Sequence, residues 1–103
     1  MSITELNGNE EYDRFLQQHQ YSLIFFGSDS CPHCHEIAPF VEELAHNYPQ
    51  LAVAHIEVTR VEVKGLPGVP VFLLYQGRQV IGTQVGADEE KLWALLQEQL
   101  GLE

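Results

Sequence analysis

Basic side chains are scarce in this sequence. Lys and Arg together number 5 against 15 Asp and Glu, which gives a formal net charge of -10. Nucleic acids and anionic membranes are themselves negatively charged, so they would be repelled at long range, and we expect neither as a partner. Most of this acidity is expected to form a solvated surface. A docking face for a basic protein is the alternative.

The sequence also lacks a long hydrophobic run, an internal repeat and a low-complexity tract. Residues 1–11 are mostly polar, unlike a signal peptide or a membrane-spanning segment, which favours a cytoplasmic location. A chain of 103 residues is long enough for one hydrophobic core and too short for two. We therefore expect a single domain over residues 1–103.

Apolar residues recur with the periods of strands and helices in the N-terminal part of the chain. Weak alternation at Ile3 and Leu6 predicts a short edge strand. Asn9 is expected to cap a helix that ends near Gln20. The apolar stripe of this helix has helical spacing and consists of Tyr12, Phe15, Leu16 and His19.

The middle of the chain predicts a strand, a helix and a second strand. Residues 21–27 are apolar on both alternations, which is typical of a strand buried on both faces. Residues 31–48 carry the strongest helical pattern, with Pro32 in its first turn and Pro39 expected to kink it. Residues 51–58 read as the next strand, so the crossover should make two parallel strands.

The C-terminal part predicts a hairpin followed by a helix. The runs 71–75 and 79–85 flank a Gly-containing turn, Asp88 is expected to cap the last helix, and Gly101 lies past its end. Residues 59–69 show no clear pattern. The expected order is β-α-β-α-β-β-β-α, or β-α-β-α-β-β-α if the unclear part is merged, which gives an α/β fold with one mixed sheet and helices on both faces.

Cys31 and Cys34 are the only cysteines, and they stand between a buried strand and a helix. In a reducing compartment such a pair more often serves catalysis or metal binding than a structural disulfide. At a helix start, unpaired backbone N–H groups and the helix dipole favour the Cys31 thiolate, so Cys31 is the expected nucleophile. Cys34 lies one turn further in and is expected to resolve the mixed disulfide without any cofactor.

Several motifs together resemble the thioredoxin family in order and approximate spacing. They are residues 26–34 with the cysteine pair, Pro39, residues 65–71 and residues 85–87. The resemblance covers nearly the whole chain. It implies a thioredoxin-like three-layer sandwich with a central mixed sheet of four to five strands. It also implies a thiol–disulfide oxidoreductase, most simply a small cytoplasmic reductase of protein disulfides.

The resemblance also implies a substrate surface and an electron donor. The Val69–Pro70 bond should be cis and lie against the cysteines, where the backbone of Val69 can pair with an extended substrate. Gly86 would line the same surface, and Ser30 stands where the family has a Trp. The donor would be a thioredoxin reductase or the glutathione system, and the protein is expected to be a monomer.

Four other positions depart from the thioredoxin pattern. Pro32 and His33 occupy the centre of the motif, where thioredoxins usually carry Gly-Pro, and a protonated His33 should stabilise the Cys31 thiolate and raise the reduction potential. The family's buried acid is replaced by Phe25, and its accompanying lysine by His55. His55 could therefore act as the proton relay for Cys34, or be an ordinary strand histidine.

Two other functions are compatible with the sequence. Cys31, His33, Cys34 and His35 offer metal-ligating atoms, but only two look convergent and a closed zinc site needs four, so no metal site is predicted. The chain could also be a thioredoxin-like interaction module whose cysteines are idle.

Overall fold

The computed structural model describes residues 3–103, which form five strands and three helices. The chain order is β-α-β-α-β-β-β-α, the longer of the two predicted orders. The elements are β1 Ile3–Glu5, α1 Asn9–Gln18, β2 Tyr21–Gly27, α2 Pro32–Asn47, β3 Leu51–Glu57, β4 Val71–Gln76, β5 Gln79–Val85 and α3 Glu89–Leu100.

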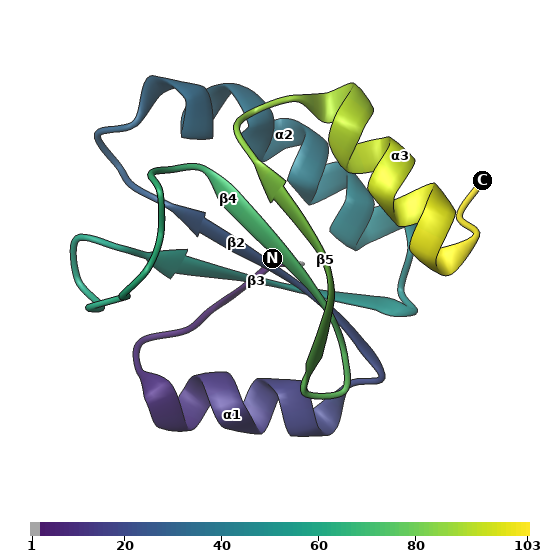
Figure 1. The fold of residues 1–103 in the computed structure, drawn as a ribbon, viewed down its shortest axis with the longest axis horizontal. Coiled ribbons are helices and arrows are strands. Elements are labelled where there is room, and N and C mark those ends of the chain that lie inside the picture. The colour runs from purple at the N-terminus through teal and green to yellow at the C-terminus, as the bar shows by residue number, and fades with distance from the viewer. Residues whose placement is uncertain (1–2) are drawn as a thin grey trace.

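The strands form one mixed sheet in the order β1-β3-β2-β4-β5. Strand β3 pairs in parallel with β1 and β2, whereas β4 runs antiparallel to both β2 and β5. Helix α1 lies on one face of this sheet, and α2 and α3 lie on the other (Figure 1). This three-layer arrangement confirms the predicted fold.

Strand β2 is central because its side chains are apolar on both faces. Successive side chains of a strand point to opposite sides. Leu23 and Phe25 accordingly join the core under α2 and α3, while Ile24 and Phe26 join the core over α1. All four are almost completely buried. The end of β2 therefore has a fixed position, and the cysteine loop begins there.

Helix α2 carries the cysteine pair at its N-terminus. Cys31 is its N-cap and Pro32 its first residue, as predicted. Pro39 lies inside the helix, which continues to Asn47. The helix is held against the sheet by an apolar stripe of helical period, namely Ile37, Val41 and Leu44.

The predicted cap of α1 is wrong. Gly8, not Asn9, is the N-cap residue, and no side chain caps this end of the helix. The Tyr12 N–H donates to the Gly8 carbonyl at 3.0 Å, so the helix begins one residue earlier than the Asn9 signal indicated. Buried Phe15 and Leu16 hold the helix to the sheet.

The end signals of the last helix are confirmed. The Asp88 side chain accepts a hydrogen bond from the Lys91 N–H at 3.1 Å. Gly101 adopts the left-handed conformation, with φ 68°, that an L side chain disfavours. These two residues define both ends of α3.

The connection between β3 and β4 contains no helix and runs as turns and irregular backbone. Val61, Val63 and Leu66 are partly buried and pack against the core on the α1 side of the sheet. Among the described residues, no helix is both long enough and apolar enough to cross a bilayer.

Candidate redox site

The two cysteines occupy different environments although both are free thiols in this structure. Cys31 is partly exposed, and its Sγ accepts a hydrogen bond from the Cys34 backbone N–H at 3.1 Å. Cys34 is only 4% exposed. A donor at the N-terminus of a helix stabilises negative charge, so this N–H is placed to stabilise charge that develops on the Cys31 sulfur.

Burial raises the pKa of the Cys34 thiol well above its ordinary value. A hydrogen bond with Cys31 and the nearby negative charge of Glu57 act in the same direction. Cys34 therefore stays protonated at neutral pH while Cys31 is the accessible sulfur. This asymmetry is what a nucleophilic cysteine and a resolving cysteine require.

The Val69–Pro70 peptide bond lies beside Cys31 and is cis, as the resemblance implied. The Val69 carbonyl is 3.9 Å from the Cys31 Sγ. Gly86 donates its N–H to the Pro70 carbonyl at 2.9 Å. The structure thus brings together Val69, Pro70 and Gly86, which are far from the cysteines in sequence.

The remaining motif residues face solvent. Pro32 and Ser30 are exposed, and the Ser30 hydroxyl contacts the Ser28 hydroxyl at 3.0 Å. The side chain of His33 is 72% exposed, and its Nδ1 lies 3.4 Å from the Glu36 carboxylate. On the side of the motif, the surface around Cys31 therefore carries Ser30, the Pro32 ring and the His33 imidazole.

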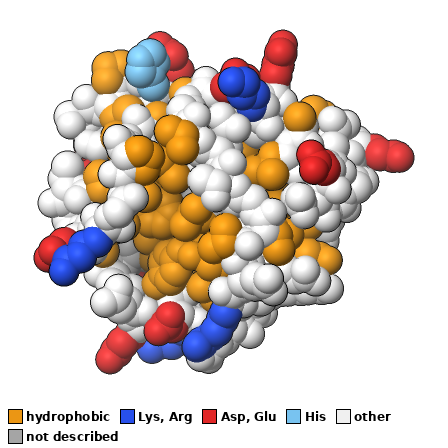
Figure 2. Space-filling model, viewed as in Figure 1, with side chains coloured by type: hydrophobic (Ala, Val, Ile, Leu, Met, Phe, Trp, Pro, Cys, Tyr) orange, Lys and Arg blue, Asp and Glu red, His pale blue; other side chains and the backbone are white. Residues whose placement is uncertain are grey.

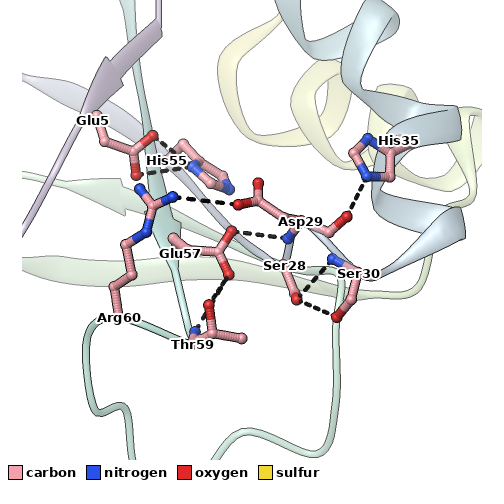
Figure 3. A network of polar contacts seen from close by, with 9 residues as sticks. All are labelled: Glu5, Ser28, Asp29, Ser30, His35, His55, Glu57, Thr59 and Arg60. Atoms are coloured by element: carbon pink, nitrogen blue, oxygen red, sulfur yellow. Dashed lines mark hydrogen bonds and ion pairs between the residues drawn. The ribbon is translucent and has the colours of Figure 1, made fainter.

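Glu57 is a buried carboxylate that the sequence analysis missed (Figure 3). It accepts hydrogen bonds from the Thr59 hydroxyl at 2.6 Å and from the N–H groups of Asp29 at 2.9 Å and Thr59 at 3.3 Å. The Thr59 hydroxyl contributes most to holding the Glu57 pKa below its usual value. Glu57 therefore remains ionised and ties the β2–α2 loop to the segment after β3.

Asp29 extends this network across the loop before Cys31. Its carbonyl accepts a hydrogen bond from His35 Nε2 at 2.6 Å, and its carboxylate lies 3.4 Å from Arg60 (Figure 3). The sequence signal that could have revealed the buried carboxylate is the position of Glu57 between the apolar residues Ile56 and Val58. An acid inside an apolar strand is buried only when hydrogen-bonded.

His55 lies on the same side of the sheet as Cys34. Its Nδ1 is 2.8 Å from the Glu5 carboxylate, and its ring packs edge-on against Phe25 with centroids 5.1 Å apart. Cys34, His55 and Glu5 all line a cleft of about 200 Å³ between the sheet and α2. The structure therefore brings His55 and Cys34 to one cleft.

The histidines of the motif do not converge on the cysteines. His33 approaches Glu36, whereas His35 bonds to the Asp29 carbonyl. Within residues 3–103, no three His, Cys, Asp or Glu side chains are grouped so as to hold a metal ion.

Comparison with known proteins agrees with this geometry. The family model described as Thioredoxin matches residues 3–98. The chain belongs to the thioredoxin family. Thioredoxins are thiol–disulfide oxidoreductases that act on protein disulfides, and the paired Cys31 and Cys34 supply that chemistry here.

Individual thioredoxins show the same similarity over most of their length. The thioredoxin-like protein of Fusarium culmorum is 32% identical over 112 residues, spanning 97% of this chain and 93% of that protein. Thioredoxin 1 of Plasmodium falciparum is 26% identical over 91 residues, spanning 84% and 88%. A mutant thioredoxin from Halobacterium salinarum superposes with a TM-score of 0.86 at 28% identity, covering 98% of this chain and 93% of that one.

Proposed function

We propose that this member of the thioredoxin family acts in the cytoplasm as a small reductase of protein disulfides, with residues 1–103 forming one catalytic domain. The observation that carries the proposal is the unequal pair of sulfurs. Cys31 is accessible and accepts the Cys34 backbone N–H, whereas Cys34 is buried with a raised pKa.

The reaction follows from this inequality. The Cys31 thiolate attacks one sulfur of the client disulfide, so a Cys31–client bond forms and the other client sulfur leaves as a thiolate. Cys34 then loses its proton and attacks Cys31 Sγ, which releases the second client thiol. Two electrons have passed to the client, and a Cys31–Cys34 disulfide remains.

The client would lie across the surface that surrounds Cys31. The backbone of Val69 would pair with an extended segment of the client, since Pro70 offers no competing N–H. Gly86 and Ser30 would border the segment. Pro32 would start the helix that positions Cys31, and His33 would add positive charge near the thiolate.

Turnover requires a donor that reduces the Cys31–Cys34 disulfide. Thioredoxin reductase and the glutathione system are the two donors that fit a reaction needing no bound cofactor. We propose that the protein works with one of them as a monomer.

We further propose that His55 relays the proton of Cys34. The Glu5 carboxylate holds His55 Nδ1, and both residues line the cleft that reaches Cys34. A water in this cleft would carry the proton to the imidazole. In the His55→Ala variant, the pH profile of disulfide reduction should differ from that of the wild type; a profile identical to that of the wild type would remove the relay.

The function itself is tested by insulin disulfide reduction with thioredoxin reductase or glutathione as donor. The wild type should be active with at least one of them, and Cys31→Ser should give the blank rate. Cys34→Ser should accumulate the mixed disulfide between Cys31 and the client. A Cys31→Ser variant as active as the wild type would instead indicate idle cysteines and an interaction module.

A further inference from the structure

A second surface of the molecule is an apolar groove, which lies next to the proposed redox site. It is about 780 Å³ in volume and opens between α1, the β3–β4 connection and strand β5. Figure 2 shows this face hollowed and lined by hydrophobic side chains. The lining residues that matter here are Tyr12, Phe26, Val63, Leu66, Val71 and Val85.

The groove exists because no helix covers this part of the sheet. The floor residues Phe26 and Val71 are buried, but the walls are not closed over them. Val63 and Leu66 are half-buried, and Val85 is 55% exposed. A pocket of this size with mainly apolar walls is typical of a binding site.

The groove borders the surface that surrounds Cys31, because its lining residues Val71 and Val85 are the chain neighbours of Pro70 and Gly86. Pro67 and Val71 line it on one side, and between them in the chain lies Val69, whose carbonyl is 3.9 Å from the Cys31 Sγ. On the other side Val85 lines it, next to Gly86. A polypeptide lying across Val69 therefore reaches the groove directly.

The charges around the groove favour a basic occupant. Glu62 lines it, and the first turn of α1 carries Glu10, which is exposed, and Glu11, which is half-buried, beside the lining residue Asn9. Lys64 is the opposing cation in the wall. The chain as a whole carries -10, so a second copy would be repelled and a cationic segment attracted.

We propose that this groove binds an apolar, positively charged segment of the client protein whose disulfide Cys31 attacks. The inference rests on the proposed reductase activity and names its substrate class. Apolar side chains of the segment would fill the groove, and its Lys or Arg residues would face the acidic rim. Because the groove borders the Val69 surface, this contact would hold the client disulfide beside Cys31.

The test uses three synthetic peptides that carry the same cysteine as a mixed disulfide with thionitrobenzoate. The first peptide has an apolar flank that contains Lys residues. The second has the same apolar flank with Glu in place of Lys. The third keeps the Lys residues but has Ser in place of the apolar side chains. Pre-reduced protein is mixed with each peptide, and thionitrobenzoate release gives the second-order rate constant. The apolar Lys peptide should react about tenfold faster than either of the others, as expected for one buried aliphatic contact assisted by charge.

Two matched pairs of variants locate the effect. Val63→Asp places a charge in the groove, and Val80→Asp places one on an exposed valine of β5 outside it. Glu62→Lys and Glu98→Lys change the net charge equally, but only Glu62 lines the groove. Val63→Asp should abolish the preference for the apolar Lys peptide over the Lys peptide with Ser, and Glu62→Lys should reduce the preference over the Glu peptide about threefold. Val80→Asp and Glu98→Lys should keep it.

The outcomes separate this inference from the proposed function. Equal rates for the three peptides, or an unchanged preference in Val63→Asp, would overturn the groove proposal while leaving an active reductase. Equal preference for the apolar flank with Lys and with Glu would also overturn it. A dimer that forms with rising protein concentration in the wild type but not in Val63→Asp would overturn it too, because a second copy of the chain would then occupy the groove. No release by wild type above the Cys31→Ser blank would instead reject the reductase activity. Circular dichroism of each variant confirms that it is folded.

Discussion

His33 lies within the first turn of α2 and adds positive charge near Cys31 when it is protonated. The Glu36 carboxylate lies 3.4 Å from the imidazole Nδ1. A cation near the thiolate stabilises the reduced protein, so the reduction potential should lie between about -270 mV, the value for thioredoxin, and about -120 mV, the value for a strongly oxidising periplasmic oxidase that has the same fold and also carries a Cys-Pro-His-Cys motif. His33→Ala should lower the potential by about 10–20 mV, because the charge is exposed and partly screened.

Equilibration with glutathione buffers measures this potential. His46→Ala, at an exposed histidine near the other end of α2, is the control and should leave the value unchanged. A wild-type potential at or below the thioredoxin value would contradict the role of His33.

The negative charge of Glu57 affects both the stability of the protein and the pKa of the Cys34 thiol. Glu57→Gln should destabilise the protein by about 1–3 kcal/mol at pH 7, because a buried carboxylate with three donors is replaced by a neutral amide. The folded-state pKa of Glu57 is lowered, so its stabilisation is present above the unfolded value of about 4.3 and is lost as pH falls through the folded value. Removing the charge should also lower the pKa of the Cys34 thiol.

Urea unfolding of both proteins at pH 7 and at acid pH measures this difference. The gap between wild type and Glu57→Gln should narrow on acidification, and thiol titration should show Cys34 ionising at lower pH. Glu62→Gln, at an exposed glutamate in the β3–β4 connection, provides the control. A gap that is the same at both pH values would show that the charge of Glu57 does not matter.

The sequence revealed the residues whose signals are local. Cys31 and Cys34 form a short motif, and Pro70 follows Val69 just before an apolar run, so pattern and resemblance located them. Glu57 was missed because its partner Asp29 is 28 positions away in the chain and meets it only after β2 and β3 pair.

At the scale of elements, the strong periodic patterns were predicted well and the weak signals were not. Residues 31–48 have an apolar stripe over several turns, and few structures other than a helix would place all these side chains on one face. The prediction that Asn9 caps α1 rested on its residue type alone. In the structure the Tyr12 N–H donates to the Gly8 carbonyl, so Gly8 is the cap. Residues 59–69 had no pattern, and they fold as turns whose shape depends on packing against the sheet.

The two helix starts give a matched prediction. Asp88→Ala removes a side-chain cap and should destabilise the protein by about 1 kcal/mol. Asn9→Ala should cost much less, because no side chain caps α1. Chemical denaturation of the two variants checks this difference, and equal losses would mean that the Asp88 hydrogen bond contributes nothing.

At the scale of the whole molecule, the apolar pattern determined the layers. A strand that is apolar on both faces must be covered on both, and here one helix covers one side while two cover the other (Figure 1). The pattern could not show that the α1 side would be incompletely covered, because that depends on the path of the β3–β4 connection. The groove is therefore visible only in the structure.

The net charge of -10 is also a property of the whole molecule, and it should make stability depend on salt. The molecule measures 33 × 28 × 26 Å. The Debye length is about 30 Å at 0.01 M salt, so every charge then repels every like charge, whereas at 0.15 M it is about 8 Å and only neighbours interact. NaCl should therefore raise the urea midpoint, mostly below about 0.15 M.

The control for this prediction is a change of pH. Near the isoelectric point of about 4.7 the net charge is close to zero, so the same addition of NaCl should leave the midpoint almost unchanged. If NaCl lowers the midpoint at pH 7, attractive ion pairs such as Asp29–Arg60 outweigh the repulsion. The acidity would then be locally balanced, and the attraction of basic client segments to the groove would also have to be weak.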